Sequence, residues 1–185
     1  MNPTRLAGRR RALVLLGGAP LLLAGCGFKL RGQRPLPFES IYLGMSAYSE
    51  LAAAIRREIR ANGGTRIVDK PEDAQVRLEV QADIKDKLIL ALNTQGRVRE
   101  YQLRQRFIFR LVSKSGQEIT PSNEILLRRD LAFDDTQLLA KQQEETLLYR
   151  DMQNDLVQQL MRRLAATKMP EAPPAEASPA PASKP

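Results

Sequence analysis

The only cysteine of the chain stands where export and lipid attachment would use it. Residues 1–11 carry four arginines and no acid, and residues 12–23 form an apolar run too short to span a bilayer. Leu23-Ala24-Gly25 then precedes Cys26. Small residues let the backbone lie extended in a peptidase cleft, and the thiol accepts a diacylglyceryl group. We predict that residues 1–25 are a lipoprotein signal peptide and that Cys26 carries N-acyl and S-diacylglycerol lipid as a membrane anchor.

Two alternatives remain open at this terminus. An ordinary secretory signal has the same charged and apolar parts, with Cys26 present by chance. The arginines are also compatible with twin-arginine export, although the full motif is missing, rather than with the general secretory route. Gly27 follows the cysteine, where an aspartate would favour retention in the inner membrane of many diderm bacteria. We therefore predict a lipid anchor in the outer membrane, on its periplasmic side.

The composition excludes most kinds of catalysis and cofactor binding. With one cysteine and no histidine, the chain has no internal disulfide, no Cys/His zinc site and no Ser-His or Cys-His dyad. Asp134-Asp135 is the one adjacent carboxylate pair that we considered for acid/base chemistry, and its members would point apart on a strand. Helix capping is the better interpretation of that pair. We therefore predict no enzyme activity, no metal site and no cofactor other than the covalent lipid on Cys26.

The positive charge has two sources. The arginines of residues 1–11 account for half of the net charge of +8, so the chain without its signal is only mildly basic. That excess is too small to indicate a nucleic-acid partner, which we do not expect. Six of the remaining basic residues fall on the free face of an expected sheet. These are Arg104, Arg106 and Arg110 on one strand, Arg77 and Lys85 on the strand before it, and Arg128 on the strand after it.

That basic face has two interpretations. One is a solvated surface with cross-strand ion pairs. The other is a surface that meets phosphates or acidic groups. Arg97 and Arg99 beside the Gly96 turn, and Lys141 at the start of the last helix, would extend such a surface.

The elements that position these residues follow from the hydrophobic pattern. Residues 40–43 are a short β-like run. Ser49 can cap a helix over residues 49–61, in which apolar residues recur every four positions and which Asn62-Gly63-Gly64 ends. Residues 136–164 show the strongest helical pattern, with leucines and methionines in one line.

Three strands lie between those helices. Residues 74–92 alternate with unusual persistence, and we expect Val76, Leu78, Val80, Ala82, Ile84, Leu88, Leu90 and Leu92 on one buried face. A second alternating run covers residues 101–111, and a third covers about 125–133. The turns at residues 93–96 and 113–116 make them antiparallel neighbours.

The predicted fold class is α+β. Two amphipathic helices pack on one face of a four-stranded, largely antiparallel sheet, in the order β-α-β-β-β-α. The predicted organisation is a signal peptide over residues 1–25, a lipidated linker over 26–39 and one domain over 40–168. A disordered tail rich in Pro and Ala follows over 169–185.

Several runs of residues together resemble the LPS-assembly lipoprotein family LptE, also called RlpB. The first is Gly25-Cys26-Gly27-Phe28-Lys29-Leu30-Arg31-Gly32, followed by Arg60-Ala61-Asn62-Gly63 at the end of the first helix. Glu100-Tyr101-Gln102-Leu103 comes after a turn. Ala132-Phe133-Asp134-Asp135 leads into Ala140-Lys141 and a long helix through Gln158-Gln159-Leu160. The resemblance covers most of the expected domain and excludes the Pro/Ala tail.

The resemblance implies the same two-helix, four-strand fold and a role without catalysis. Family members plug the outer-membrane β-barrel LptD, help it to assemble, and bind lipopolysaccharide on its way to the outer leaflet. The resemblance also places Lys141 at a basic position that the family uses for lipopolysaccharide contact. The turn of residues 93–99 matches a second such region, with Thr94 where a charge is expected and Arg97 as its substitute. Arg99, Arg104 and Arg106 complete the predicted lipopolysaccharide-binding set.

Two other functions remain as alternatives. A free periplasm-facing binding or chaperone lipoprotein would have the same anchor and fold without a barrel partner. A hydrolase is disfavoured because no histidine and no nucleophile motif is present.

Overall fold

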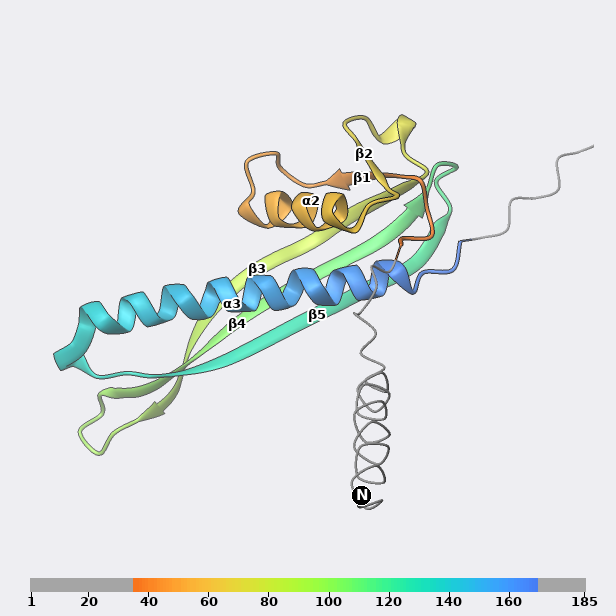
Figure 1. Cartoon of the computed structure of the whole chain (residues 1–185). Helices are drawn as coiled ribbons and strands as arrows, with labels where there is room; N and C mark the ends of the chain where they lie inside the picture. Colours follow the sequence, from red (N-terminus) through yellow and green to blue (C-terminus); the bar gives the residue numbers. More distant parts are fainter. Residues whose placement is uncertain (1–34, 170–185) are drawn as a thin grey trace, which may run out of the picture. The chain divides into compact units, whose positions relative to one another are not determined.

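The structure is a computed structural model that describes residues 35–169. These residues form an α+β fold, a five-stranded sheet with two long helices (Figure 1). The predicted signal peptide, Cys26 and residues 170–185 of the predicted tail lie outside the described residues. Leu36 and Phe38, from the predicted linker, are buried in the core of the described fold. The predicted domain bounds stay predictions.

The sheet has the strand order β2-β1-β3-β4-β5. Its strands are β1 (Ser40–Gly44), β2 (Arg66–Val68), β3 (Val76–Leu92), β4 (Val98–Ser113) and β5 (Glu118–Ala132). The first strand is parallel to both of its neighbours, whereas β3, β4 and β5 form the predicted antiparallel meander. Because β1 pairs with β3 only from Val76 to Glu79, the rest of β3 is an open edge of the sheet.

The prediction of four largely antiparallel strands is therefore wrong in two respects. The sheet is mixed, and it has a fifth strand that the sequence pattern did not indicate. Parallel neighbours need a crossover connection, and the first helix is that connection between β1 and β2. At three residues, β2 is too short to show an alternating pattern, and it is located by pairing with β1.

Both predicted helices are present. Helix α2 covers Glu50–Asn62, and the Ser49 hydroxyl accepts a hydrogen bond from the Ala52 amide at 3.3 Å, as a capping residue does. Gly63 ends α2 with φ of 69°, a conformation that glycine adopts without strain. Helix α3 covers Leu138–Ala165 and follows a 3-10 turn, η4, over Asp135–Gln137. Another 3-10 turn, η3, covers Pro71–Asp73 before β3.

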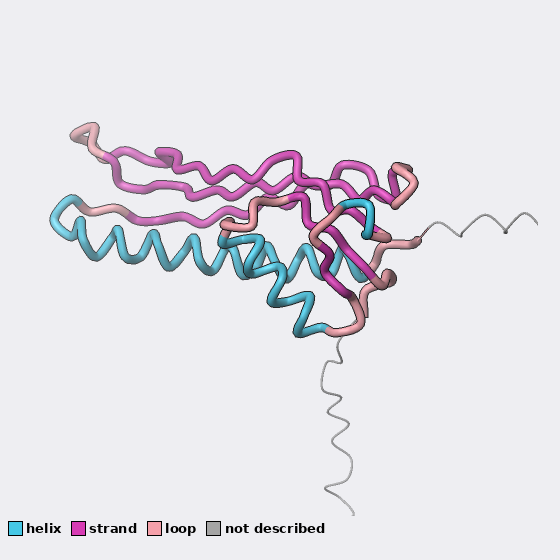
Figure 2. Tube along the Cα trace, turned by 90° about the horizontal axis from the view of Figure 1, so that it is seen from above, coloured by secondary structure: helices cyan, strands magenta, loops and turns pink. Residues whose placement is uncertain are grey.

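The core lies between the helices and one face of the sheet (Figures 1 and 2). The predicted line of α3 side chains is confirmed at Met152, Leu156, Leu160 and Leu164, none of which has exposed surface. Ile55 and Ile59 of α2 are equally buried. The sheet contributes Phe107, Phe109 and Leu111 from β4 and Ile125, Leu127 and Leu131 from β5. Packing of two amphipathic helices on one face is therefore confirmed.

A β-bulge at Gln81 contradicts the predicted continuous buried face of β3. Val80 pairs with Phe109 but Ala82 pairs with Ile108, so one extra residue reverses the side-chain direction. Before the bulge Val76 and Leu78 are fully buried, and beyond it Ile84 and Leu88 are each 40% exposed. Leu90 and Leu92, farther along, are also exposed. The polar residues Asp83, Lys85 and Lys87 pair with β4 residues of the helix-covered face instead.

The last strand begins earlier than the alternating pattern indicated, at Glu118 rather than near Ile125. Pro121 lies inside this extension. It is tolerated because β5 is an edge strand, where a missing backbone N–H on the open side breaks no ladder bond. Among helices of residues 35–169, none combines the length and the hydropathy that a membrane span requires.

Candidate functional site

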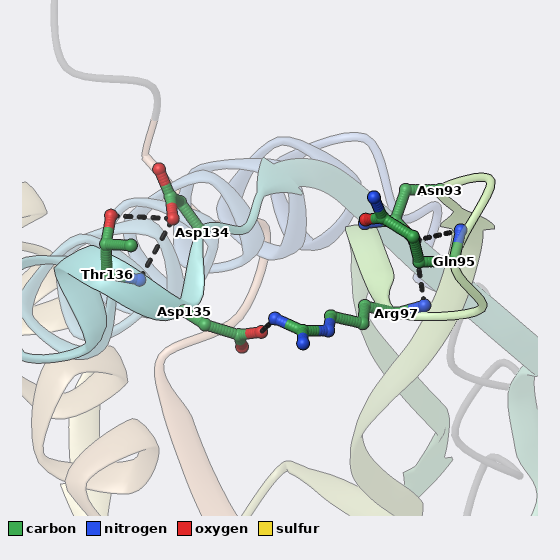
Figure 3. A network of polar contacts seen from close by, with 6 residues as sticks. All are labelled: Asn93, Gln95, Arg97, Asp134, Asp135 and Thr136. Carbon is green, nitrogen blue, oxygen red and sulfur yellow. Dashed lines mark hydrogen bonds and ion pairs between the residues drawn. The ribbon is translucent and has the colours of Figure 1, made fainter.

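Two chain connections meet at one end of the sheet, and we call them together the sheet tip. They are the β3–β4 turn, residues 93–97, and the β5–α3 connection, residues 133–137 (Figure 3). In the turn, the Asn93 side-chain oxygen accepts hydrogen bonds from the backbone amides of Gln95 at 3.0 Å and Arg97 at 2.9 Å. These bonds, with Gly96 at φ of 75°, define the backbone conformation of the turn.

In the β5–α3 connection, Asp134 has the capping role predicted for the acidic pair. Its carboxylate accepts from the Thr136 amide at 2.9 Å and from the Thr136 hydroxyl at 2.8 Å. These two bonds, the backbone one first, lower the pKa of Asp134 below its ordinary 3.8. Asp135 points elsewhere and forms an ion pair of 4.0 Å with Arg97, which joins the two connections (Figure 3). Both side chains of that pair are more than half exposed, so it holds the tip weakly.

Beside the sheet tip, an open hollow of about 540 Å³ lies under the start of α3, and we call it the tip pocket. Its floor is Lys87, whose ammonium lies 2.5 Å from the Glu145 carboxylate and 4.3 Å from the ring centre of Tyr101. Phe133 meets the Tyr101 ring edge to face at 5.1 Å. The pocket therefore combines aromatic walls with a neutralised cation.

Lys141 and Leu138 of α3 also line the tip pocket. The Lys141 ammonium lies 2.8 Å from Glu144, three residues along the helix, and its side chain is only 18% exposed. Its positive charge thus faces the pocket but is held by an exposed carboxylate that a ligand anion can replace. Leu138 is 51% exposed and gives the same pocket an apolar rim.

Tyr149 closes the far side of the tip pocket. Its hydroxyl donates to the backbone oxygen of Asp86 at 3.1 Å, which ties α3 to β3. Burial raises the pKa of Tyr149, and the nearby carboxylates of Glu145 and Asp86 raise it further.

The structure brings together three of the five predicted lipopolysaccharide-binding residues. Arg97 and Arg99 line a shallow hollow of the sheet tip, and Lys141 lines the adjoining tip pocket, with Phe133 shared by both. Arg104 and Arg106 lie instead on the sheet face without helices. Arg104 lies between Asp86 of β3 and Arg128 of β5, and Arg106 lies between Ile84 of β3 and Leu126 of β5. The assignment of all five to lipopolysaccharide stays a prediction.

The predicted basic face is partly neutralised, as the ion-pair interpretation requires. Arg110 lies 2.7 Å from Glu79 and 3.8 Å from Glu118, and Arg104 lies 3.4 Å from Asp86. Arg106 and Arg128 form no ion pair within residues 35–169. The placement of Lys85 on this face is wrong, because the bulge at Gln81 turns it to the helix side.

Sequence reasoning missed the interior of the tip pocket. Lys87 and Glu145 are 58 positions apart, and no local pattern signals that they meet. The helical position of Tyr149 likewise gives no sign that its hydroxyl donates a hydrogen bond to β3. Within the described residues, no group of three or more acidic, histidine or cysteine side chains is arranged to hold a metal ion.

Comparison with known proteins identifies the family. A family model described as "Lipopolysaccharide-assembly", LptE, matches residues 38–164. The chain belongs to the LptE family. An LPS-assembly lipoprotein LptE from Photorhabdus laumondii is 31% identical over 168 residues, which cover 87% of this chain and 84% of that protein. One of the same name from Yersinia enterocolitica is 31% identical over 84% of this chain and 75% of its own length.

Solved structures support this membership in the LptE family. The solution NMR structure of an uncharacterized lipoprotein B from Nitrosomonas europaea is 39% identical and has a TM-score of 0.67, covering 76% of this chain and 91% of that one. The crystal structure of rare lipoprotein B from Shewanella oneidensis is 27% identical with a TM-score of 0.60, covering 69% and 95%. The resemblance to the LptE (RlpB) family that the sequence motifs indicated is confirmed.

Proposed function

We propose that this LptE-family chain binds lipopolysaccharide at the sheet tip during lipopolysaccharide assembly, as a partner of the outer-membrane barrel LptD. The observation that carries the proposal is the convergence of Arg97, Arg99 and Lys141 on one end of a fold that belongs to this family. No step of this function requires catalysis, and the family is one of assembly lipoproteins.

The chemistry of the sheet tip suits a ligand that is both anionic and apolar. Arginine and lysine side chains bind phosphate by charge-assisted hydrogen bonds. The same end of the molecule exposes leucines that water does not favour: Leu92 is 56% exposed, Leu138 51% and Leu139 70%. Lipopolysaccharide presents phosphates beside acyl chains, so its lipid moiety matches both kinds of surface.

The proposed location follows from the predicted lipid anchor. Acylation of Cys26 would give the protein more than one lipid chain, and two or more chains hold a protein stably on a membrane. With Gly27 rather than aspartate next to the cysteine, the proposed destination is the outer membrane, periplasmic side. A protein anchored there would meet lipopolysaccharide that arrives from the periplasm.

The proposed partner is LptD, with the folded part of this chain as a plug inside the barrel and as an aid to its assembly. Barrel lumens are polar surfaces. The sheet face without helices presents Arg104, Arg106 and Arg128 together with the half-exposed Ile84 and Leu126, a mixture suited to a polar wall. A free periplasm-facing binding or chaperone lipoprotein is the alternative, and it predicts no barrel.

The ligand is tested with purified lipopolysaccharide and the full-length protein in mild detergent. The tip variant is Arg97→Gln, Arg99→Gln and Lys141→Gln. The control variant, Arg66→Gln, Lys114→Gln and Arg162→Gln, removes the same charge at exposed positions outside the tip. We expect the tip variant to raise the Kd about tenfold and the control to leave it within about twofold, because contacts to charged groups are worth more than diffuse attraction. Equal losses in both variants would reject a localised site.

The partner is tested by cross-linking in intact envelopes, followed by affinity purification of the tagged chain. Recovery of a protein of LptD size, identified by mass spectrometry, is the expected result. A tagged chain recovered only by itself, under detergent conditions that preserve other outer-membrane complexes, would favour the free lipoprotein instead.

A further inference from the structure

A second hollow, separate from the sheet tip, lies between the two helices. We call it the interhelix pocket, and its volume is about 660 Å³. Arg57 of α2, Lys85 of β3 and Arg150 of α3 line it, so each of three elements contributes one cation. Tyr149, Gln153 and Asn154 of α3 form one wall. No part of the proposed lipopolysaccharide site uses these three cations.

The cations of the interhelix pocket have no ion-pair partner in the described part of the chain. No ion pair within residues 35–169 involves Arg57, Lys85 or Arg150. Lys87, two residues from Lys85 on the same strand, lies 2.5 Å from Glu145 and shows what pairing at this face looks like. Glu50 is the one acidic residue in the lining of the interhelix pocket. The pocket therefore keeps a positive excess, which a concave surface concentrates on an incoming anion.

The strand register determines which face of the sheet carries Lys85. The bulge at Gln81 turns Lys85 to the helix-covered face, where its ammonium lies 5.7 Å from the ring centre of Tyr149. The Tyr149 ring is itself held by the bond from its hydroxyl to the Asp86 backbone oxygen at 3.1 Å. Strand and helix thus present Lys85 and an aromatic face side by side.

The polar wall favours one kind of anion. The amides of Gln153 and Asn154 line the pocket, and each offers a donor and an acceptor. Sugar hydroxyls and a peptide backbone can both pair with such amides. The Tyr149 ring beside them favours the sugar, because an aromatic ring packs well on the apolar face of a sugar.

We propose that the interhelix pocket binds a phosphorylated saccharide, with Arg57, Lys85 and Arg150 on the phosphate and Gln153 and Asn154 on the sugar. The pocket shares Thr146 and Tyr149 with the tip pocket, so one phosphorylated glycolipid can occupy both. Only that last step, which makes lipopolysaccharide the source of the sugar, rests on the proposed function. A free sugar phosphate is the other source.

The test uses the full-length protein in mild detergent and isothermal titration with four probes: glucosamine 6-phosphate, glucosamine, inorganic phosphate and hexaglutamate. We expect glucosamine 6-phosphate to bind at least about tenfold more tightly than the other three. Equal binding of inorganic phosphate would overturn the saccharide assignment. Equal binding of hexaglutamate would make the pocket an acidic-peptide site and overturn the proposal.

The residues are tested with the pocket variant Arg57→Gln, Lys85→Gln and Arg150→Gln. We expect it to weaken glucosamine 6-phosphate binding about tenfold, while the control variant Arg66→Gln, Lys114→Gln and Arg162→Gln stays within about twofold. Equal losses, or no loss, would overturn the assignment. If the pocket variant does not fold, as judged by circular dichroism, the double variant Gln153→Leu and Asn154→Leu tests the saccharide assignment in its place. That variant must lose glucosamine 6-phosphate binding and keep its response to inorganic phosphate.

Lipopolysaccharide binding by the tip variant and the pocket variant distinguishes this proposal from the function proposed above. If the tip variant loses lipopolysaccharide binding but the pocket variant still binds every probe normally, the sheet tip stands and the interhelix pocket fails. If glucosamine 6-phosphate binding depends on the pocket but lipopolysaccharide does not bind, the pocket stands, its source is a free sugar phosphate, and the proposed function fails.

Discussion

Tyr149 is one of the residues that couple α3 to the open part of β3. Its hydroxyl donates to the Asp86 backbone oxygen at 3.1 Å, and burial raises its pKa above the ordinary 10.0. A raised pKa means that the folded protein holds the phenol proton more tightly than the unfolded chain. The stability that this adds is complete below pH 10 and is lost as the pH rises from 10 through the folded-state pKa.

We expect Tyr149→Phe to lower the free energy of unfolding by about 0.5–1.5 kcal/mol at pH 7, the usual net value of one hydrogen bond. Above pH 10, the difference between wild type and variant should shrink, because only the wild type has this phenol to titrate. Urea denaturation at pH 7, 9 and 11 measures both effects. A difference that is constant across these pH values would show that the hydroxyl is not held by β3.

Lys87 and Glu145 form the contact across the tip pocket, with side chains 34% and 24% exposed. Partial burial weakens solvent screening, so this pair should be worth more than an exposed pair. A double-mutant cycle with Lys87→Met and Glu145→Gln should give a coupling of about 0.5–1 kcal/mol. The control is Arg97→Gln with Asp135→Asn, a pair whose side chains are 71% and 60% exposed and for which we expect about 0.2 kcal/mol. Equal couplings would contradict the shielded position of Lys87.

At the scale of elements, the close approach of β1 and β3 depends on one glycine. A Cβ at Gly44 would lie 2.8 Å from the Leu78 carbonyl oxygen, which is backbone and cannot rotate away. Gly44→Ala should therefore lower the free energy of unfolding by about 1–3 kcal/mol, although alanine also restricts the unfolded chain by about 0.4–1 kcal/mol. Urea denaturation followed by circular dichroism measures the net change. A stabilised variant would mean that the two strands separate at no cost.

The elements show where sequence patterns suffice. Both long helices and the three-strand meander were predictable. Ile55 and Ile59, like Met152 and Leu156, recur at helical spacing, and β4 alternates over most of its length. The bulge at Gln81 was not predictable. Apolar residues keep the same parity on both sides of it, and only pairing with β4 reveals that Ile84 and Leu88 face away from the core.

The same bulge limited the prediction of the candidate sites. Arg97, Arg99 and Lys141 were predicted from a turn, a helix start and the family resemblance, and their assignment to lipopolysaccharide stays a prediction. The interhelix pocket was out of reach, because Lys85 was expected on the opposite face of the sheet. Its other cations, Arg57 and Arg150, look like ordinary polar-face residues of two helices until the fold brings them together.

At the scale of the whole molecule, charge is distributed over surfaces with different environments. The sheet face without helices pairs Arg104 with Asp86 and Arg110 with Glu79, so much of its charge is neutralised within the fold. The interhelix pocket is not neutralised in this way, and at the sheet tip only exposed carboxylates oppose the cations. A ligand anion should therefore prefer the helix side and the tip, while the other face remains available to a protein wall.

The predicted anchor residue, Cys26, precedes Leu36, the first core side chain of the described residues, by ten positions. We therefore expect Cys26→Ala to leave the thermal midpoint of the folded part unchanged while removing the proposed lipid.

Without acyl chains the protein should leave the outer-membrane fraction and appear as a soluble or inner-membrane-tethered precursor. Gly27→Ala, which keeps the thiol, is the control. Because LptD could retain an unlipidated plug, fractionation is done in cells depleted of the barrel. A Cys26→Ala chain that still fractionates with the outer membrane there would show that acylation does not determine its location.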